Sequence, residues 1–132
     1  MPGSFFDTNV LVYFASDEAA KADRAEELLL GGGTISVQVL NELALVCRRR
    51  FAFSWEEVHE TLHRIRAAVE VRPLDLEIHD TGLEIAESYQ LSIYDSFLLA
   101  AALSADCDVF WSEDLQHGLT VEGRLTVQNP FR

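Results

Sequence analysis

The chain has 132 residues, of which 48% are hydrophobic, and this size and composition predict a single domain, residues 1–132, with a core of its own. No apolar stretch reaches the roughly eighteen residues of a membrane helix, and the N-terminus has no signal-peptide pattern, so we expect a cytoplasmic protein without a membrane partner. The net charge of −12, concentrated in the second half of the chain, disfavours a general nucleic-acid binder unless a metal ion, a local basic patch or a partner supplies positive charge.

The first half of the chain alternates between strand-like and helix-like patterns. Residues 4–15 are rich in β-branched and aromatic side chains, which favour a strand, but a polar triplet, Asp7, Thr8 and Asn9, interrupts or ends it. Such a triplet costs free energy in an apolar run unless its side chains have partners, so it either caps a helix or builds a site. The elements expected after it are a helix over residues 16–30, a short strand over 34–37, and helices over 37–51 and 54–69.

The second half predicts two more helices and further strands. The expected elements are a short strand or turn over residues 70–75, helices over 76–90 and 92–107, a strand over 108–112, a loop over 113–123 and a last strand over 125–131. Pro130 has no backbone N–H and therefore favours an edge position for the last strand. This order predicts an α/β fold, a three-layer α/β/α sandwich with a mostly parallel sheet.

Four acidic residues fall where such a fold binds ligands, beyond the carboxyl ends of its strands. Asp7 ends or interrupts the first strand, Glu42 lies early in the helix after the second strand, Asp95 is in the first turn of a later helix, and Asp114 follows the strand over 108–112. Each alone has a structural explanation as a cap, a turn residue or a solvated side chain. Ser92, three residues before Asp95, even completes a capping pattern.

Gathered together, these carboxylates imply a cation. Two carboxylates about 4 Å apart repel by roughly 4 kcal/mol at an effective dielectric constant near 20, so a fold that gathers four must hold a cation, hold protons or lose stability. Mg²⁺ and Mn²⁺ prefer oxygen ligands. A carboxylate site that holds such ions positions a phosphodiester and lowers the pKa of the attacking water, without a catalytic His, Ser or Cys. The ions would also present positive charge to a phosphate from an acidic protein.

Four segments carry a family resemblance. FFDTNVLVY, ISVQVLNEL, IYDSFLLAAAL and VFWSEDLQHG, in this order and at these separations, resemble a PIN-domain ribonuclease, most closely the VapC-type toxins of bacterial toxin–antitoxin pairs. The resemblance implies a mostly parallel, five-stranded PIN-like sandwich and a Mg²⁺- or Mn²⁺-dependent endoribonuclease that hydrolyses RNA phosphodiester bonds. It also implies a homodimer, and a cognate antitoxin that inserts a C-terminal segment, often with a basic residue, into the acidic groove.

The same resemblance assigns roles to individual residues. The metal-binding and catalytic acids fall on Asp7, Glu42, Asp95 and Asp114, and the supporting polar positions on Thr8, Asn9 and Ser112. Glu113 is adjacent to Asp114, and either could be the fourth acid. The spacing of a serine, any residue and an aspartate favours Asp114.

Two alternatives remain open at this point. Residues 59–63 read HETLH, which on a helix could place His59 and His63 on one zinc ion with Glu60 as the base of a metalloprotease. No pattern supplies the third ligand, and two surface histidines on a polar helix flank explain the segment better. The second alternative is a catalytically silent acidic metal-binding scaffold.

Arginines and tryptophans outside the acidic motifs are assigned first to structure. The run Arg48, Arg49 and Arg50 closes a predicted helix, where basic side chains interact favourably with the carbonyl end, and it could also contact an RNA backbone or a second subunit. Trp55 and Trp111 could stack on bases, but core packing is expected for each.

Overall fold

A six-stranded sheet organises the computed structural model, which describes residues 3–132. The strands are β1 (Ser4–Phe6), β2 (Thr34–Ser36), β3 (Glu70–Arg72), β4 (Val109–Trp111), β5 (Thr120–Val121) and β6 (Leu125–Gln128). Their order across the sheet is β3-β2-β1-β4-β6-β5, with β5 antiparallel to β6 and every other pair parallel. This confirms the predicted α/β fold with a mostly parallel sheet, although the sheet has six strands rather than five.

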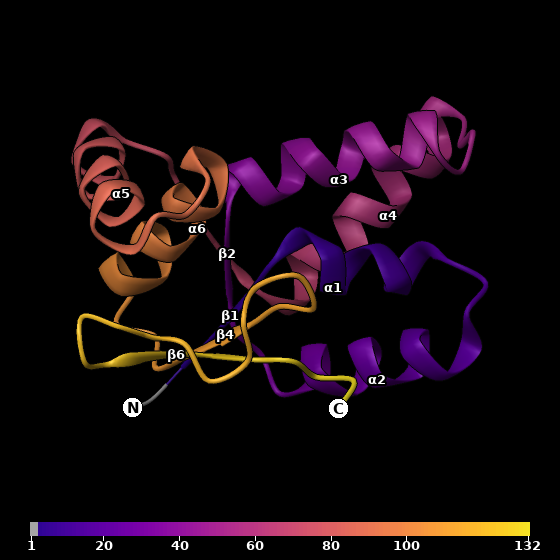
Figure 1. The fold of residues 1–132 in the computed structure, drawn as a ribbon. Coiled ribbons are helices and arrows are strands. Elements are labelled where there is room, and N and C mark those ends of the chain that lie inside the picture. Colours follow the sequence, from indigo (N-terminus) through magenta and orange to yellow (C-terminus); the bar gives the residue numbers. More distant parts are fainter. Residues whose placement is uncertain (1–2) are drawn as a thin grey trace.

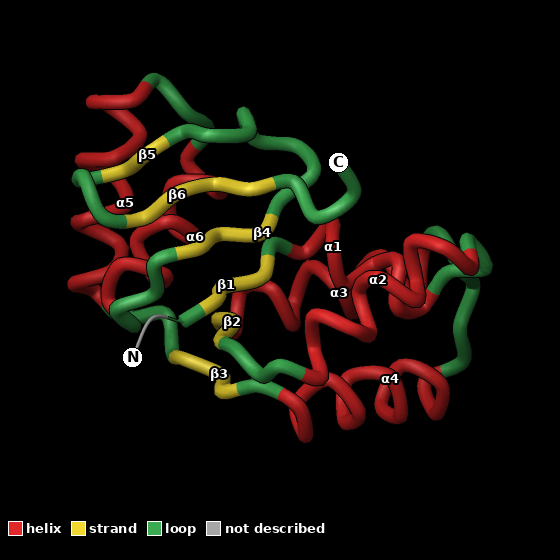
Figure 2. Tube along the Cα trace, turned by 90° about the horizontal axis from the view of Figure 1, so that it is seen from below, coloured by secondary structure: helices red, strands yellow, loops and turns green. Residues whose placement is uncertain are grey.

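Six α-helices and one short 3₁₀ helix connect the strands. They are α1 (Thr8–Val12), the 3₁₀ helix η1 (Tyr13–Ala15), α2 (Ala19–Leu30), α3 (Val37–Arg49), α4 (Trp55–Ala68), α5 (Leu76–Tyr89) and α6 (Ile93–Ser104), all within residues 3–132. In both views of the fold, α5 and α6 lie together on one side of the molecule, whereas α1 to α4 gather on the other (Figures 1 and 2). None of the helices in residues 3–132 combines the length and apolar character needed to cross a bilayer.

The central strands are short and bury large apolar side chains, as expected for parallel strands covered on both faces. Phe5 of β1 pairs in register with Phe110 of β4, and their rings stack at a centroid distance of 5.5 Å. Both side chains are completely buried, as are Ile35 of β2 and Val127 of β6. This packing fixes the carboxyl ends of β1 and β4 side by side.

The first polar triplet starts a helix instead of interrupting a strand. β1 ends at Phe6, and Asp7, with extended backbone angles, is the residue before α1. The strand predicted over residues 4–15 is wrong beyond Phe6, because the β-branched residues Val10 and Val12 lie in α1. Because α1 buries Val10 and Leu11 completely in the core, tertiary packing overrides the weak preference of these residues for strands.

The C-terminal segment also differs from its prediction. The loop expected over residues 113–123 contains β5, which forms a hairpin with β6. Glu122 and Gly123 have positive φ angles of 54° and 68°, which allow the chain to reverse between these two strands. Consequently β6 lies between β4 and β5 and is not an edge strand, and Pro130 lies beyond its end.

The close packing of α5 on α6 positions the helix that carries Asp95. Gly82 of α5 lies against Phe97 of α6, and a Cβ atom at position 82 would overlap the Phe97 ring and come within 3.2 Å of its Cα. Only glycine therefore allows this approach. Ser92 caps α6 by accepting a hydrogen bond from the backbone N–H of Asp95 at 3.1 Å, which leaves the Asp95 carboxylate in the first turn.

Candidate functional site

The candidate site is a hollow at the carboxyl ends of β1 and β4. From β1 the chain continues on one side of the sheet through β2 and β3, and it then crosses to the other side of β1 to form β4. The strand order therefore reverses between β1 and β4. Ligands of open α/β sheets bind at such switch points. The hollow has a volume of about 310 Å³ and is lined by Asp7, Thr8, Asn9, Val12, Glu42, Val46, Asp95 and Asp114. The structure thus brings all four sequence-predicted acids around one cavity, together with Thr8 and Asn9.

Asp7 is the most buried of the four acids, with only 5% of its surface exposed. Its Oδ2 accepts hydrogen bonds from Ser112 Oγ at 2.8 Å and from Asn9 Nδ2 at 3.1 Å. Its backbone N–H donates to the carbonyl of Trp111 at 2.9 Å, which ties it to the end of β4. Ser112 and Asn9 therefore hold one carboxylate oxygen of Asp7.

Burial makes the charge on Asp7 costly. Removal from water raises the pKa of its carboxyl from the usual 3.8 to about 7, and the nearby Asp95 and Glu42 carboxylates push it in the same direction. The hydrogen bond from Ser112 acts in the opposite direction because it favours the charged form. A cation in the hollow would remove this cost.

Stability without divalent cations is therefore expected to fall as the pH rises. Between about pH 4 and pH 7 the folded protein binds the Asp7 proton more tightly than the unfolded chain, so the free energy of unfolding decreases over this range, by about 4 kcal/mol at most. Urea unfolding in EDTA at pH 4.5 and pH 8 measures the difference. An Asp7→Asn variant should lose most of it, and an equal pH dependence in parent and variant would contradict the burial effect.

Glu42 is held by two neighbours, one of which the sequence did not single out. Thr8 Oγ1 donates a short hydrogen bond to Glu42 Oε1, and Gln38 Nε2 donates to Glu42 Oε2 at 3.2 Å. Gln38 is buried, and its Nε2 also donates to the carbonyl of Tyr94 at 3.1 Å, so it bridges α3 to the first turn of α6. Its position one helical turn before Glu42 was the available signal.

Ser112 organises the loop after β4. Besides donating to Asp7, its Oγ accepts hydrogen bonds from the backbone N–H groups of Asp114 and Leu115, each at 3.2 Å, and from Asn9 Nδ2 at 3.3 Å. A small hydroxyl that bonds to backbone groups two and three residues further on fixes a tight turn. That turn brings Asp114 to the hollow.

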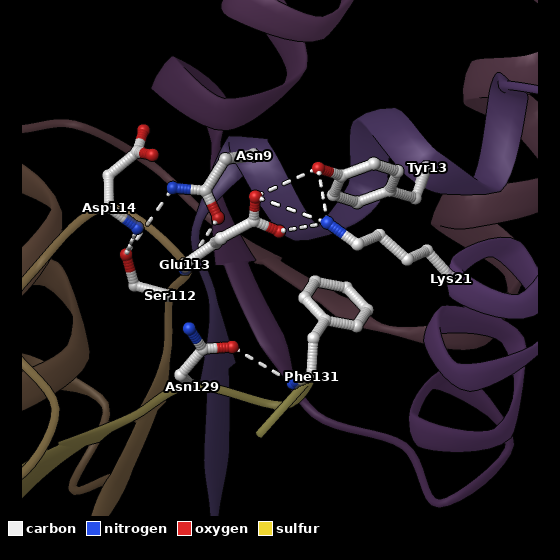
Figure 3. Close-up of polar contacts among 8 residues, drawn as sticks. All are labelled: Asn9, Tyr13, Lys21, Ser112, Glu113, Asp114, Asn129 and Phe131. Carbon is white, nitrogen blue, oxygen red and sulfur yellow. Dashed lines mark hydrogen bonds and ion pairs between the residues drawn. The ribbon is translucent and has the colours of Figure 1, made fainter. Parts of the chain in front are cut away.

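Glu113 faces away from the hollow, whereas its neighbour Asp114 lines it. The Glu113 carboxylate accepts a hydrogen bond from Tyr13 Oη at 2.9 Å and pairs with Lys21 Nζ at 3.3 Å. Its backbone N–H donates to Asn9 Oδ1 at 3.0 Å. Figure 3 shows the Glu113 side chain extending toward Tyr13 and Lys21, and the Asp114 carboxylate pointing elsewhere. Of the two adjacent acids, Asp114 is the one that lines the hollow.

The donor set fits a hard divalent cation. All four charged groups of the hollow are carboxylates, and Asp7 among them is buried. Within the described residues, no three His, Cys, Asp or Glu side chains already stand close enough to hold an ion together. Mg²⁺ is commonly held by one or two carboxylates while it keeps several water ligands, and this arrangement matches that habit.

The zinc-protease alternative finds no third ligand. His59, Glu60 and His63 lie exposed on α4, beside a hollow between α3 and α4. No group of three potential metal ligands includes them among residues 3–132. The HETLH segment therefore reads as the solvated flank of an amphipathic helix, whose buried face carries Val58 and Ile65.

Comparisons with known proteins identify a family and a fold. The chain matches the family model described as PIN domain over residues 4–118. A sequence search against curated proteins found no match. Among solved structures, a toxin–antitoxin complex from Klebsiella pneumoniae is similar at a TM-score of 0.74 and 17% identity, over 96% of this chain and 97% of that chain.

Two further structures are similar to the chain. VapBC from Salmonella typhimurium, solved bound to DNA, has a TM-score of 0.71 and 18% identity, over 98% of this chain and 99% of that chain. VapC20 from Mycobacterium tuberculosis, described as a toxin that cleaves the sarcin–ricin loop, has a TM-score of 0.63 and 16% identity, over 81% of this chain and 86% of that chain. At these identities the likeness is one of fold.

Proposed function

This chain belongs to the PIN domain family, and we propose that it is a metal-dependent endoribonuclease that acts as the toxin of a toxin–antitoxin pair. One observation carries the proposal: Asp7, Glu42, Asp95 and Asp114 line a single hollow at the switch point of the sheet, and Asp7 is buried there at a cost to its charged form. Such a site suits a phosphodiester substrate because the cations it attracts complement phosphate.

Each residue of the hollow has a defined part in this proposal. Asp7, Asp95 and Asp114, with Glu42, would hold Mg²⁺ or Mn²⁺, which supplies polarisation of the phosphodiester and a lowered pKa for the attacking water. Ser112 and Asn9 keep the Asp7 carboxylate in one orientation. Thr8 and Gln38 do the same for Glu42 through its two oxygens. The supporting residues thus restrict rotation of the carboxylates before any substrate arrives.

The proposed protein partners are a cognate antitoxin and a second copy of the chain. The similar structure from Klebsiella pneumoniae is a toxin–antitoxin complex by its description. The hollow is acidic, so a basic side chain of an antitoxin would complement it and compete with metal. Leu76, Ile93 and Tyr94, around α5 and the start of α6, are large apolar residues that are more than half exposed, and they support a homodimer contact on that side.

Incubation of the purified protein with structured and unstructured RNAs tests the activity. We expect cleavage with Mg²⁺ or Mn²⁺ and none with EDTA, with the cut ends mapped by primer extension. The same ions should raise the Tm by several degrees, because a ligand that binds only the folded state stabilises it. Metal stabilisation without cleavage of any RNA would favour the silent metal-binding scaffold. The absence of both metal stabilisation and cleavage would contradict the site itself.

A further inference from the structure

Basic residues are concentrated on one side of the molecule, whereas acidic residues lie on both sides. Residues 73–123, which include α5, α6 and β4, contain acidic residues throughout and no lysine or arginine. The arginines of α3 and α4 lie on the opposite side of the molecule, where these helices project together (Figure 1). An RNA strand leaving the acidic hollow would therefore meet repulsion on the α5–α6 side and attraction on the α3–α4 side.

The arginine run at the end of α3 is not used for internal ion pairing. Although acids outnumber bases in the chain, Arg48, Arg49 and Arg50 form no ion pair with a carboxylate of residues 3–132. Arg48 is instead fixed by a hydrogen bond from Nη1 to the carbonyl of Phe53 at 2.8 Å. Because these guanidinium groups have no carboxylate partner in such an acidic protein, they are available to bind an external anion.

Trp55 adds an aromatic surface to this cluster and does not pack in the core, contrary to the sequence-based expectation. Its side chain is 62% exposed, whereas Trp111 lies partly buried in β4 as expected. The Arg48 guanidinium lies 4.2 Å from the centroid of the Trp55 ring. Next to them is a hollow of about 310 Å³, lined by Asn41, Ala44, Leu45, Arg48, Arg49 and Trp55.

This hollow is aligned with the acidic site along one helix. Glu42 and Arg49 are seven residues apart on α3, which places them on the same face about 10 Å apart along the axis. Leu45, which is half exposed, lies between them. A strand with one phosphate at the acidic hollow could therefore place a neighbouring nucleotide at Arg49 and Trp55.

We propose that the Arg48–Arg49–Trp55 hollow is a subsite for an unpaired nucleotide of the RNA substrate, with the base on Trp55 and the phosphate on Arg49. The proposal rests on the proposed ribonuclease function. Bases stack on exposed aromatic rings with little sequence preference, and arginine supplies the backbone contact. RNA is favoured over a protein partner here because the free positive charges adjoin an aromatic ring on the helix that carries Glu42.

Binding of fluorescein-labelled decamers tests the subsite. The probes are oligouridine, oligoadenosine and an abasic decamer, measured by anisotropy in EDTA on an Asp7→Asn background that does not cut them. Trp55→Leu should weaken binding of the two base-bearing decamers about tenfold, whereas Trp55→Phe should retain most of the affinity. The abasic decamer should bind both variants and the parent with equal affinity. Arg49→Gln should reduce the slope of log affinity against log salt by about 0.7, as for one lost phosphate contact on a single strand.

Arg124→Gln is the matched control, because it removes the same charge from an exposed arginine. Arg124 lines a different hollow, between α5 and α6, that contains none of the four site acids. The substitution should leave both affinity and salt slope near the parental values. The subsite alone would be overturned if Arg49→Gln and Arg124→Gln changed RNA affinity and salt slope equally. It would also be overturned if Trp55→Leu bound RNA with the parental affinity while the parent still cleaves RNA. A change only in oligomer mass or antitoxin binding would assign the surface to a protein and also overturn it. A parent that neither binds nor cuts RNA would overturn the function.

Discussion

An Asp7→Asn variant is expected to cleave RNA on the order of a thousandfold more slowly than the parent, while unfolding at a higher temperature in EDTA at pH 8. The amide keeps the shape of the carboxyl and can still accept the hydrogen bond from Ser112, but it removes the negative charge that attracts the metal. Loss of one preorganised charge in an active site typically costs a hundredfold to a thousandfold in rate. The stability gain follows from the same charge, because its burial raises the pKa of Asp7 to about 7.

Asp108→Asn is the control for this substitution. Asp108 is exposed at the start of β4, at the other end of the strand from the hollow, and undergoes the same chemical change. Single-turnover cleavage assays and thermal unfolding with and without Mg²⁺ compare the variants. The two effects of Asp7→Asn must occur together, since they share one cause. If Asp7→Asn cleaved RNA at the parental rate, Asp7 would not be part of the site. If Asp7→Asn had a lower Tm than the parent in EDTA, the charge on Asp7 would not destabilise the fold.

The positions of Asp7, Asp95 and Asp114 could be predicted from the sequence because each lies near the end of a recognisable element, whereas Glu42 lies within α3. Asp7 follows an aromatic strand, and Asp95 follows the capping residue Ser92, so the boundaries of these elements fix where the carboxylates lie. The structure places α6 with Ser92 as its cap, as the capping pattern predicts. Sequence motifs at element boundaries are informative because caps and strand ends restrict the backbone locally.

Features that depend on tertiary packing could not be predicted in the same way. The strand-like residues after Asn9 form a helix because the core buries them there, and no local preference signals this. The hydrogen bond from Gln38 to the carbonyl of Tyr94 could not be predicted, because it depends on α3 and α6 meeting in space. The residue type of Trp55 favours core packing, yet the position of α4 leaves its side chain exposed. Burial in each case is decided by which elements meet in space.

The orientation of Glu113 also depends on distant residues. Tyr13 and Lys21, which lie around a hundred positions earlier in the chain, hold its carboxylate away from the hollow. Lys21 is the only lysine in the chain, and its ammonium also lies 4.6 Å from the Tyr13 ring centroid. The serine spacing favoured Asp114, and this contact set gives that preference a physical cause: one of two adjacent acids already has its partners.

Asp114→Asn and Glu113→Gln should therefore have very different effects on cleavage. Asp114→Asn removes a carboxylate that lines the hollow and is expected to slow RNA cleavage about a hundredfold or more. Glu113→Gln keeps an oxygen that can accept from Tyr13 and loses only a partly exposed ion pair with Lys21, which contributes about 1 kcal/mol at most. Its cleavage rate should stay within a few fold of the parent.

Metal titrations separate the roles of the two acids further. Asp114→Asn should need a higher Mn²⁺ concentration to reach its half-maximal increase in Tm, because one potential ligand is lost, whereas Glu113→Gln should follow the parental curve. If Glu113→Gln lost cleavage and metal stabilisation while Asp114→Asn kept both, Glu113 and not Asp114 would be the acid of the site. Because both substitutions replace an acid by its amide in the same turn, a difference between them cannot come from net charge and must come from where each side chain points.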